Sequence, residues 1–181
     1  MVSTINGDAN VPFYKELANQ GISAEGIPVM AFSVGEEELS GIDTKPLVGH
    51  LAAWNYFMSV DDLANRKFIA TWHRFIKDRK RVTNDPMEAH YIGFNLWVKA
   101  VEKAGSTDSD KVRQTILGLK TPNLTGSKAE LLENHHITKP VLIGEIREDG
   151  QFEVVRRTEK EIPGDPWSKF LSESKQDGTK D

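Results

Sequence analysis

The sequence contains no cysteine among its 181 residues. This absence excludes disulfide bonds, thiolate metal sites and cysteine nucleophiles, but it does not fix the cellular compartment. No apolar run approaches the roughly 20 residues that a helix needs to cross a bilayer, so we expect no direct membrane insertion. The first residues lack the charged segment and apolar core of an export signal, and we expect no such signal in this chain.

Positive charge is in deficit, because 23 lysines and arginines face 27 acidic residues and the net charge is −4. This balance argues against a general nucleic-acid binder, and no RNA-binding aromatic signature is present. Hydrophobic residues make up 38% and charged residues 28% of the chain, as in ordinary soluble globular proteins. The length suits one domain, or one domain and part of another.

Common catalytic and nucleotide-binding motifs are missing as well, since the chain has no GxSxG, Walker A or GxGxxG pattern. Glu36 and Glu38 could still act as a general acid and base, because two carboxylates in one cleft can separate their pKa values. The alternative is that both lie in the solvated first turn of a helix. His135 and His136 are adjacent, so on a strand they point to opposite faces and cannot easily chelate one ion. We expect no metal site and no cofactor.

The stretch Pro28–Leu39 has the most informative pattern in the chain. Pro28–Val34 is a short apolar run that suits a buried strand of a parallel sheet. Gly35 permits a tight turn, and the glutamates that follow favour the positive end of a helix dipole. Ser33 is therefore expected at the carboxyl end of a strand, where α/β sheets bind ligands. The backbone N–H groups that follow it are expected to be free to bind.

A strand–helix–strand unit is predicted for the first 34 residues, so its two strands should be parallel. Met1–Ile5 suits the first strand, and Gly21 is expected to end the helix between the strands. The loop Asn6-Gly7-Asp8 and Ser33 should then lie at the same edge of the sheet and form half of a binding site. Simple turn chemistry explains the same residue types equally well.

The middle of the chain alternates between an apolar run and helical spacing. Leu47–Val60 is predicted to run extended through a buried region, and a helix is predicted from Leu63 to about Asp78. Asp85 is predicted to cap a second helix, with Pro86 in its first position and Glu88 completing a capping box. The residues expected to be buried along this second helix are Met87, Tyr91, Phe94, Val98 and Val101.

Charge and turn signals complete the chain. The basic cluster Lys77–Arg81 is interpreted as a solvated helix end, where cations meet the negative end of the dipole. A third helix is predicted after Asp108. Val141–Ile146 and Gln151–Arg156 alternate, and Asp149-Gly150 between them predicts a hairpin turn. The polar segment Lys169–Asp181 is expected to be disordered.

Long stretches resemble, in order, the urea-type substrate-binding protein of bacterial ABC transporters. They are STINGDANVPFYKELANQGI, IPVMAFSVGEEEL, GHLAAWNYFMSVD, TNDPMEAHYIGFNLWVKAVEKAG and PNLTGSKAELLENHHITKPVLIGEIREDGQFEVV. More distant similarity links the chain to short-chain-amide sensors and branched-chain amino-acid binding proteins. The resemblance covers nearly the whole chain.

The resemblance implies a type I periplasmic-binding-protein fold, in which two α/β lobes close on a ligand by hinge motion. The family's chain is more than twice as long, so most of the first lobe and the start of the second are expected to be missing. Residues 1–46 resemble second-lobe βα units, 47–60 the crossing strand, 61–119 first-lobe helices, 120–157 return strands and a hairpin, and 158–181 a polar tail.

The resemblance also implies a binding protein without enzyme activity, periplasmic or, outside the cell, lipid-tethered. Its ligand would be urea or a short-chain amide, delivered to a membrane permease and ATPase. The matching ligand positions are Asn6, Gly7, Asp8 and Ser33, with Val34 a weaker candidate. Two alternatives stay open: an amide-sensing regulatory binding protein, and a small flavodoxin-like hydrolase that uses Glu36 and Glu38.

Overall fold

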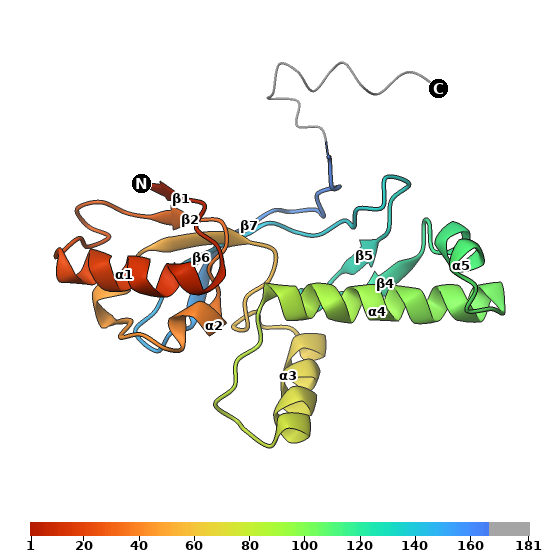
Figure 1. The fold of residues 1–181 in the computed structure, drawn as a ribbon, viewed down its shortest axis with the longest axis horizontal. Helices are drawn as coiled ribbons and strands as arrows, with labels where there is room; N and C mark the ends of the chain where they lie inside the picture. The colour runs from red at the N-terminus through yellow and green to blue at the C-terminus, as the bar shows by residue number, and fades with distance from the viewer. Residues whose placement is uncertain (167–181) are drawn as a thin grey trace, which may run out of the picture.

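A mixed sheet and one long helix organise the molecule into two halves (Figure 1). The computed structural model describes residues 1–166, so the segment Lys169–Asp181, for which disorder is expected, lies outside the described residues. The sheet half comprises residues 1–54 and 141–157, and the helical half comprises residues 63–138. Residues 55–62 and 139–140 connect the two halves, so the chain passes from one to the other and back.

Five short strands form the sheet, in the spatial order β1-β2-β3-β6-β7. Neighbouring strands β1, β2 and β3 are parallel, whereas β6 and β7 extend the sheet in antiparallel fashion. The bounds of the five strands, in that order, are Val2–Ser3, Met30–Ala31, Leu51–Trp54, Leu142–Ile146 and Phe152–Arg157. The parallel pairing predicted for the first two strands is confirmed, although both are shorter than the apolar runs that predicted them.

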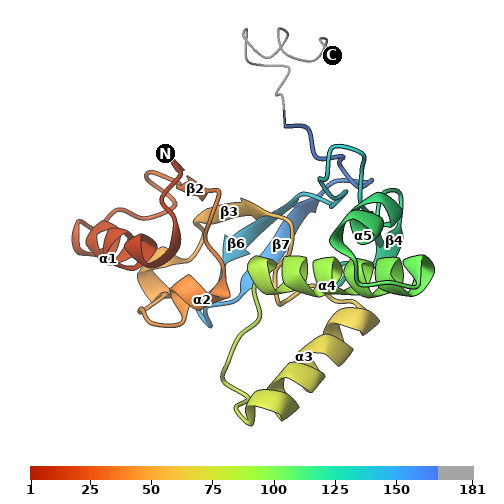
Figure 2. The ribbon, with the colours of Figure 1, turned by 45° about the vertical axis from the view of Figure 1, so that its right-hand side comes forward.

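Two helices, α1 (Asn10–Asn19) and α2 (Glu36–Leu39), lie on the same side of this sheet (Figures 1 and 2). Short 3-10 turns precede α1 and β3, at Gly7–Ala9 (η1) and Lys45–Leu47 (η2). Gly21 adopts a left-handed φ of 67° just after α1, which confirms the predicted helix end. The buried core of this half includes Tyr14, Leu17, Val29, Ala31, Val34, Leu39, Leu47, Ala52, Leu142 and Ile146.

The chain leaves the sheet directly after Trp54, so the prediction of an extended run over Leu47–Val60 is wrong outside β3. Phe57 turns back onto the sheet and stacks on Phe152, with ring centroids 4.5 Å apart. Gly144 makes room for this ring, because a Cβ atom there would lie 2.8 Å from Cε2 of Phe57. The connecting segment is therefore anchored by an aromatic side chain and not by strand pairing.

The helical half is built on the 20-residue helix α4 (Asp85–Ala104), which runs across Figure 1. Helix α3 (Leu63–Ile76) protrudes from it, and α5 (Ser109–Thr115) packs near its far end. A small antiparallel sheet, β4 (Lys120–Pro122) with β5 (Lys128–Glu130), lies against α4. Asp62 caps α3 and Asp108 caps α5, because their carboxylates accept hydrogen bonds from the N–H groups of Ala64 and Lys111, and the third helix predicted after Asp108 is confirmed.

Helix α4 buries a different face from the predicted one. Ile92, Leu96 and Ala100 are buried, and Ile92 and Leu96 form a core with Ala129 of β5. Phe94, which was expected inside, is 64% exposed. The helix has apolar residues on both faces, and the β4–β5 hairpin covers only one of them, so periodicity alone selected the wrong stripe.

The start of α4 also differs from its prediction. Asn84, not Asp85, is the N-cap, and its Oδ1 accepts a hydrogen bond from Met87 N at 3.2 Å. Asp85 and Glu88 do not cap the helix; their side chains are directed inward, and both residues are buried. The predicted capping box is therefore wrong, because the two acidic residues pair with a buried lysine instead.

That lysine, Lys139, lies between the two carboxylates and forms with them the central ion cluster. Its Nζ is 3.1 Å from Oδ2 of Asp85 and 2.6 Å from Oε2 of Glu88. Burial raises the pKa of both carboxyl groups, and the charge of Lys139 opposes that rise. Asn55 joins the cluster, since its backbone N–H donates to Asp85 at 3.2 Å and its Nδ2 donates to the Pro140 carbonyl at 2.6 Å. Both connecting segments are thereby tied to the first turn of α4.

Replacing Lys139 by methionine should destabilise the chain by about 3–5 kcal/mol, because two buried carboxylates would lose their counter-charge. Lys120→Met is the matched control, since Lys120 forms an exposed pair with Glu130 at 3.0 Å and should cost at most about 1 kcal/mol. Guanidinium unfolding curves of the three proteins measure the difference. Equal losses in the two variants would contradict the role given to the cluster.

Six aromatic side chains form a surface that we call the aromatic face. It consists of Phe68, Trp72 and Phe75 on α3 and Tyr91, Phe94 and Trp97 on α4. Phe75 is 79% exposed, and only the pair of Phe68 and Tyr91 connects the two helices, with centroids 5.2 Å apart. Exposed apolar surface of this kind promotes association.

We therefore expect the isolated 181-residue chain to self-associate and to bind a dye such as anilinonaphthalene sulfonate. The double variant Phe75→Ser/Phe94→Ser should reduce both effects, whereas Val155→Ser, at an exposed position of the sheet half, should change neither. Dye fluorescence and sedimentation velocity report the two properties. A monomer that binds no dye would contradict this expectation.

Candidate functional site

Two predicted loops meet at the carboxyl edge of the parallel strands. The side chain of Ser33, after β2, donates a hydrogen bond to Oδ1 of Asn6, after β1. The buried amide of Asn10 reinforces this contact, because its Nδ2 lies 3.0 Å from the Ser33 carbonyl and 3.1 Å from the Ile5 carbonyl. The structure thus brings together the two loops that the strand–helix–strand pattern placed at one edge.

The five candidate residues differ in what they can offer a ligand. Asn6, Gly7 and Asp8 are exposed, and Ser33 is half-buried. Gly7 has a left-handed φ of 56°, which lets the 3-10 turn η1 begin directly after Asn6. Val34 is fully buried in the sheet core, so only its backbone is available at this edge.

The third parallel strand, β3, adds a residue that the sequence reasoning missed. Trp54 ends β3 and is half-buried. A Cβ atom on Gly35 would lie 3.3 Å from Cζ3 of this indole and 3.7 Å from Cβ of Asn84. Trp54 therefore lies beside the start of α2, next to the edge that carries Ser33. Trp54 could not be singled out from the sequence, because the apolar run Leu47–Val60 contains no signal that marks where the strand ends.

The backbone N–H groups after Ser33 are less available than predicted. The N–H of Gly35 donates to Oε2 of Glu38 at 2.9 Å, which caps α2. Glu36 is only 1% exposed, so it does not belong to a solvated first turn. Its Oε1 accepts a hydrogen bond from Met58 N at 2.6 Å, while its Oε2 has no partner in the described part of the chain.

Burial raises the pKa of the Glu36 carboxyl from 4.5 to about 8. The nearby charges of Glu38 and Asp85 act in the same direction, and the backbone hydrogen bonds oppose it. A carboxyl with such a pKa resembles a general acid, but it is closed off from solvent, and Glu38 is engaged as a cap. The two glutamates therefore do not form an open catalytic pair.

Histidines and acidic residues do not converge elsewhere in the part of the chain that the structure describes. Within residues 1–166, no group of three or more histidine, aspartate or glutamate side chains is arranged to hold a metal ion. His135 and His136 are exposed in a turn in which His135 has a φ of 62°. No helix among these residues has the length and apolar character needed to cross a membrane.

Comparison with protein families identifies the fold. The chain matches the periplasmic binding protein domain over residues 1–173, so it belongs to the periplasmic binding protein family, whose members are typically periplasmic. Over 166 residues it is 25% identical to Leu/Ile/Val-binding protein homolog 6 of Brucella melitensis biotype 1, with 89% of this chain and 42% of that protein covered. A 124-residue match, 31% identical, links it to a protein named limonene hydroxylase from Geobacillus stearothermophilus, covering 68% of this chain and 22% of that protein.

Solved structures agree with this assignment. A solute-binding protein of an ABC transporter from Rhodopseudomonas palustris HaA2, in complex with p-hydroxybenzoic acid, is 25% identical with a TM-score of 0.74, over 87% of this chain and 44% of that one. A leucine-binding protein from Thermotoga maritima MSB8 shares the fold at 16% identity, with a TM-score of 0.64, over 84% and 42% of the two chains. The expected type I fold is confirmed, and the chain spans less than half the length of each of these relatives.

Glu36 gives the stability of the fold a pH dependence of known sign. Because the folded pKa of about 8 lies above the ordinary 4.5, the folded state favours the protonated acid, and wild-type stability should fall as pH rises between these values. The slope is at most roughly 1.4 kcal/mol per pH unit. Glu36→Gln should therefore be more stable than wild type at pH 8 but not at pH 4.5.

Glu37→Gln is the control, because Glu37 is exposed in the same helical turn and pairs with Arg81 at 3.6 Å. Thermal unfolding of the three proteins across pH 4.5 to 9 measures the effect. A wild type and a Glu36→Gln variant with parallel pH profiles would contradict the buried, protonated state of Glu36.

Proposed function

We propose that this chain is part of the solute-binding protein of an ABC transporter that binds urea or a short-chain amide. The ligand is held in a cleft between two lobes and delivered to a membrane permease and its ATPase. The observation that supports this proposal is the contact between Asn6 and Ser33 at adjacent strand ends, in a member of the periplasmic binding protein family. The sheet half then belongs to the second lobe, and the helical half to the first.

The chemistry of this edge favours a small neutral ligand. Urea has one carbonyl acceptor and four N–H donors, and it needs a few fixed hydrogen bonds in a dry cleft. Asn6 and Ser33 can each donate and accept, and Asp8 can accept. The segments 5–10 and 32–35 contain no lysine or arginine that would pair with a ligand carboxylate. The half-buried indole of Trp54 offers a flat apolar surface for a planar molecule.

Other ligands and activities fit this edge less well. A free amino acid would need an acid for its ammonium group and a cation for its carboxylate; Asp8 could meet the first need, but segments 5–10 and 32–35 contain no lysine or arginine to meet the second. A hydrolase would need an accessible pair of carboxylates, whereas Glu36 is buried and Glu38 caps α2. An amide-sensing regulatory protein uses the same ligand chemistry, so it remains the second candidate, and its partner would be a regulator instead of a permease.

Asn6→Ala and Ser33→Ala should each weaken urea binding by roughly 5- to 150-fold, because loss of a buried hydrogen-bond partner costs about 1–3 kcal/mol. The measurement is titration calorimetry on a protein that carries this segment at the full length of its relatives. Both residues lie in loops outside the core, so the variants should fold normally.

Asn19→Ala is the control, because Asn19 is exposed at the end of α1 and its amide contacts only Glu16 among the described residues. It should bind urea as the wild type does. Unchanged urea affinity in both site variants would place the ligand elsewhere, and binding of a carboxylate ligand but not of urea or short amides would overturn the proposed ligand class.

A further inference from the structure

Positive charge is concentrated in one short segment of this acidic chain. Residues 66–81 contain seven lysines and arginines but one aspartate, a net charge of +6 in a chain whose total is −4. The remaining residues therefore carry −10. A solvated helix end accounts for the cations after α3, but not for Arg66 at the end of its first turn, where the helix dipole disfavours a cation.

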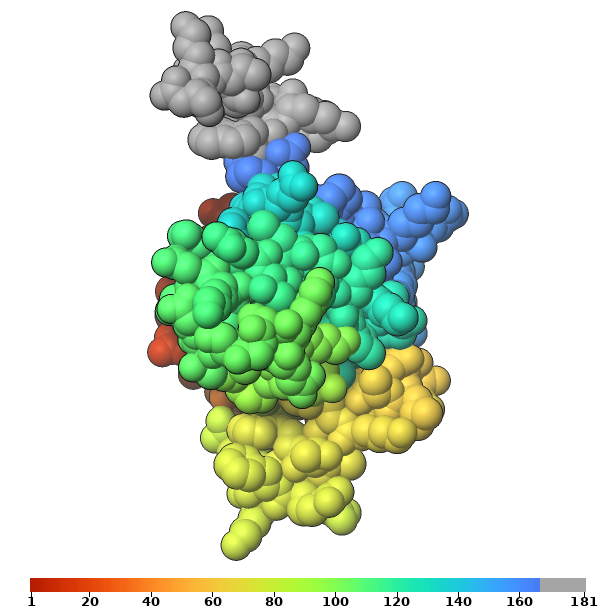
Figure 3. All heavy atoms as spheres, turned by 90° about the vertical axis from the view of Figure 1, so that its right-hand side faces the viewer, coloured from red at the N-terminus to blue at the C-terminus, as the bar shows by residue number. Residues whose placement is uncertain are grey.

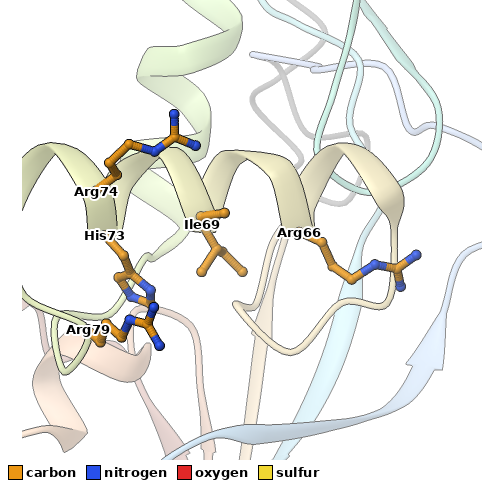
Figure 4. Close-up of a pocket in the computed structure, with 6 residues that line it drawn as sticks. Arg66, Ile69, His73, Arg74 and Arg79 are labelled. Atoms are coloured by element: carbon orange, nitrogen blue, oxygen red, sulfur yellow. The ribbon is translucent and has the colours of Figure 1, made fainter.

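Three of these seven cations line a hollow on α3, whose lining residues are shown in Figure 4. The hollow has a volume of about 580 Å³, and we call it the arginine hollow. Its lining residues are Arg66, Ile69, Ala70, His73, Arg74 and Arg79. Ile69 and Ala70 provide an apolar surface within this lining, and Figure 4 shows the guanidinium groups of Arg66, Arg74 and Arg79 extending from the lining in different directions.

Two of the three arginines have unused charge. Arg66 pairs with Asp61, but no carboxylate of the described residues lies within ion-pair distance of Arg74 or Arg79. The ring of His73 is fixed beside them, because its Nε2 lies 2.8 Å from the Arg81 carbonyl oxygen. The lining of the hollow therefore combines the imidazole of His73, fixed by its contact with the Arg81 carbonyl, with the guanidinium groups of Arg74 and Arg79, which have no carboxylate partner among the described residues.

The position of the hollow keeps it open. Helical spacing places Arg66, Ala70 and Arg74 on the side of α3 roughly opposite Phe68, Trp72 and Phe75 of the aromatic face. Figure 3 shows α3 and the loop after it protruding from the body of the molecule. Contact with the aromatic face alone would therefore leave the arginine hollow accessible.

We propose that the arginine hollow is a docking site for an acidic protein segment that carries an apolar side chain between carboxylates. The apolar side chain would lie on Ile69 and Ala70, and the carboxylates would pair with Arg74 and Arg79. Guanidinium groups bind carboxylates through two parallel hydrogen bonds, which lysines cannot do. A concave site with arginines around an apolar surface suits an inserted side chain better than a flat membrane.

The test uses the 181-residue chain and a fluorescein-labelled peptide, Glu-Glu-Leu-Glu-Glu, followed by fluorescence anisotropy. Arg74→Glu/Arg79→Glu should weaken binding by about tenfold or more, and added salt should weaken binding to the wild type. Arg74→Lys/Arg79→Lys keeps the charge but loses the paired hydrogen bonds, so an intermediate loss is expected. Circular dichroism checks that each variant is folded.

Lys15→Glu/Lys111→Glu is the matched control, because it makes the same change in net charge at exposed positions on α1 and α5. It should bind the peptide within about twofold of the wild type, as expected when only local charge matters. The peptide Gln-Gln-Leu-Gln-Gln should not bind. Peptide binding that survives Arg74→Glu/Arg79→Glu would overturn the proposal. So would arginine-dependent binding to phosphatidylglycerol vesicles, or arginine-dependent self-association, without binding of the peptide.

Discussion

The two halves of this chain are joined where Lys139 lies buried between Asp85 and Glu88. One cation compensates two carboxylates there, and Asn55 extends the contact to both connecting segments. Buried charges require such pairing, because removing one partner leaves the others desolvated. The relative position of the sheet and α4 therefore depends on a polar interaction at the connection, in addition to the separate apolar cores on either side of it.

Much of the sheet half can be predicted from local sequence patterns. The apolar run before Gly35 and the spacing of α1 predicted two parallel strands, and parallel strands must end at one edge. That reasoning is enough to place Asn6 near Ser33 from the sequence alone. It could not define the end of β3, because the segment after Trp54 stays apolar while it leaves the sheet, so Trp54 was missed.

The wrong predictions have a common physical cause. Contacts between residues distant in sequence decide which helix face is buried, which residue caps a helix and which side chain is solvated, where the local sequence allows either choice. Helix α4 carries apolar residues on two faces, and the β4–β5 hairpin determines that Leu96 is buried while Phe94 is exposed. Asn84 and Asp85 are both good caps, and Lys139 attracts the second of them inward. The run of glutamates at 36–38 is typical of a solvated helical turn. Glu36 is nevertheless buried by the packing around α2, and its carboxylate accepts a hydrogen bond from Met58 N.

We propose that Asn6 and Ser33 form one side of a cleft for a small neutral ligand. Backbone amide NMR spectra during a urea titration, on a protein carrying this segment at the full length of its relatives, test it most directly. We predict that the amide signals of Asn6, Gly7 and Ser33 shift together and saturate, while that of Asn19 does not. Saturable shifts confined to other regions, or no saturable shift at any urea concentration below unfolding, would contradict it.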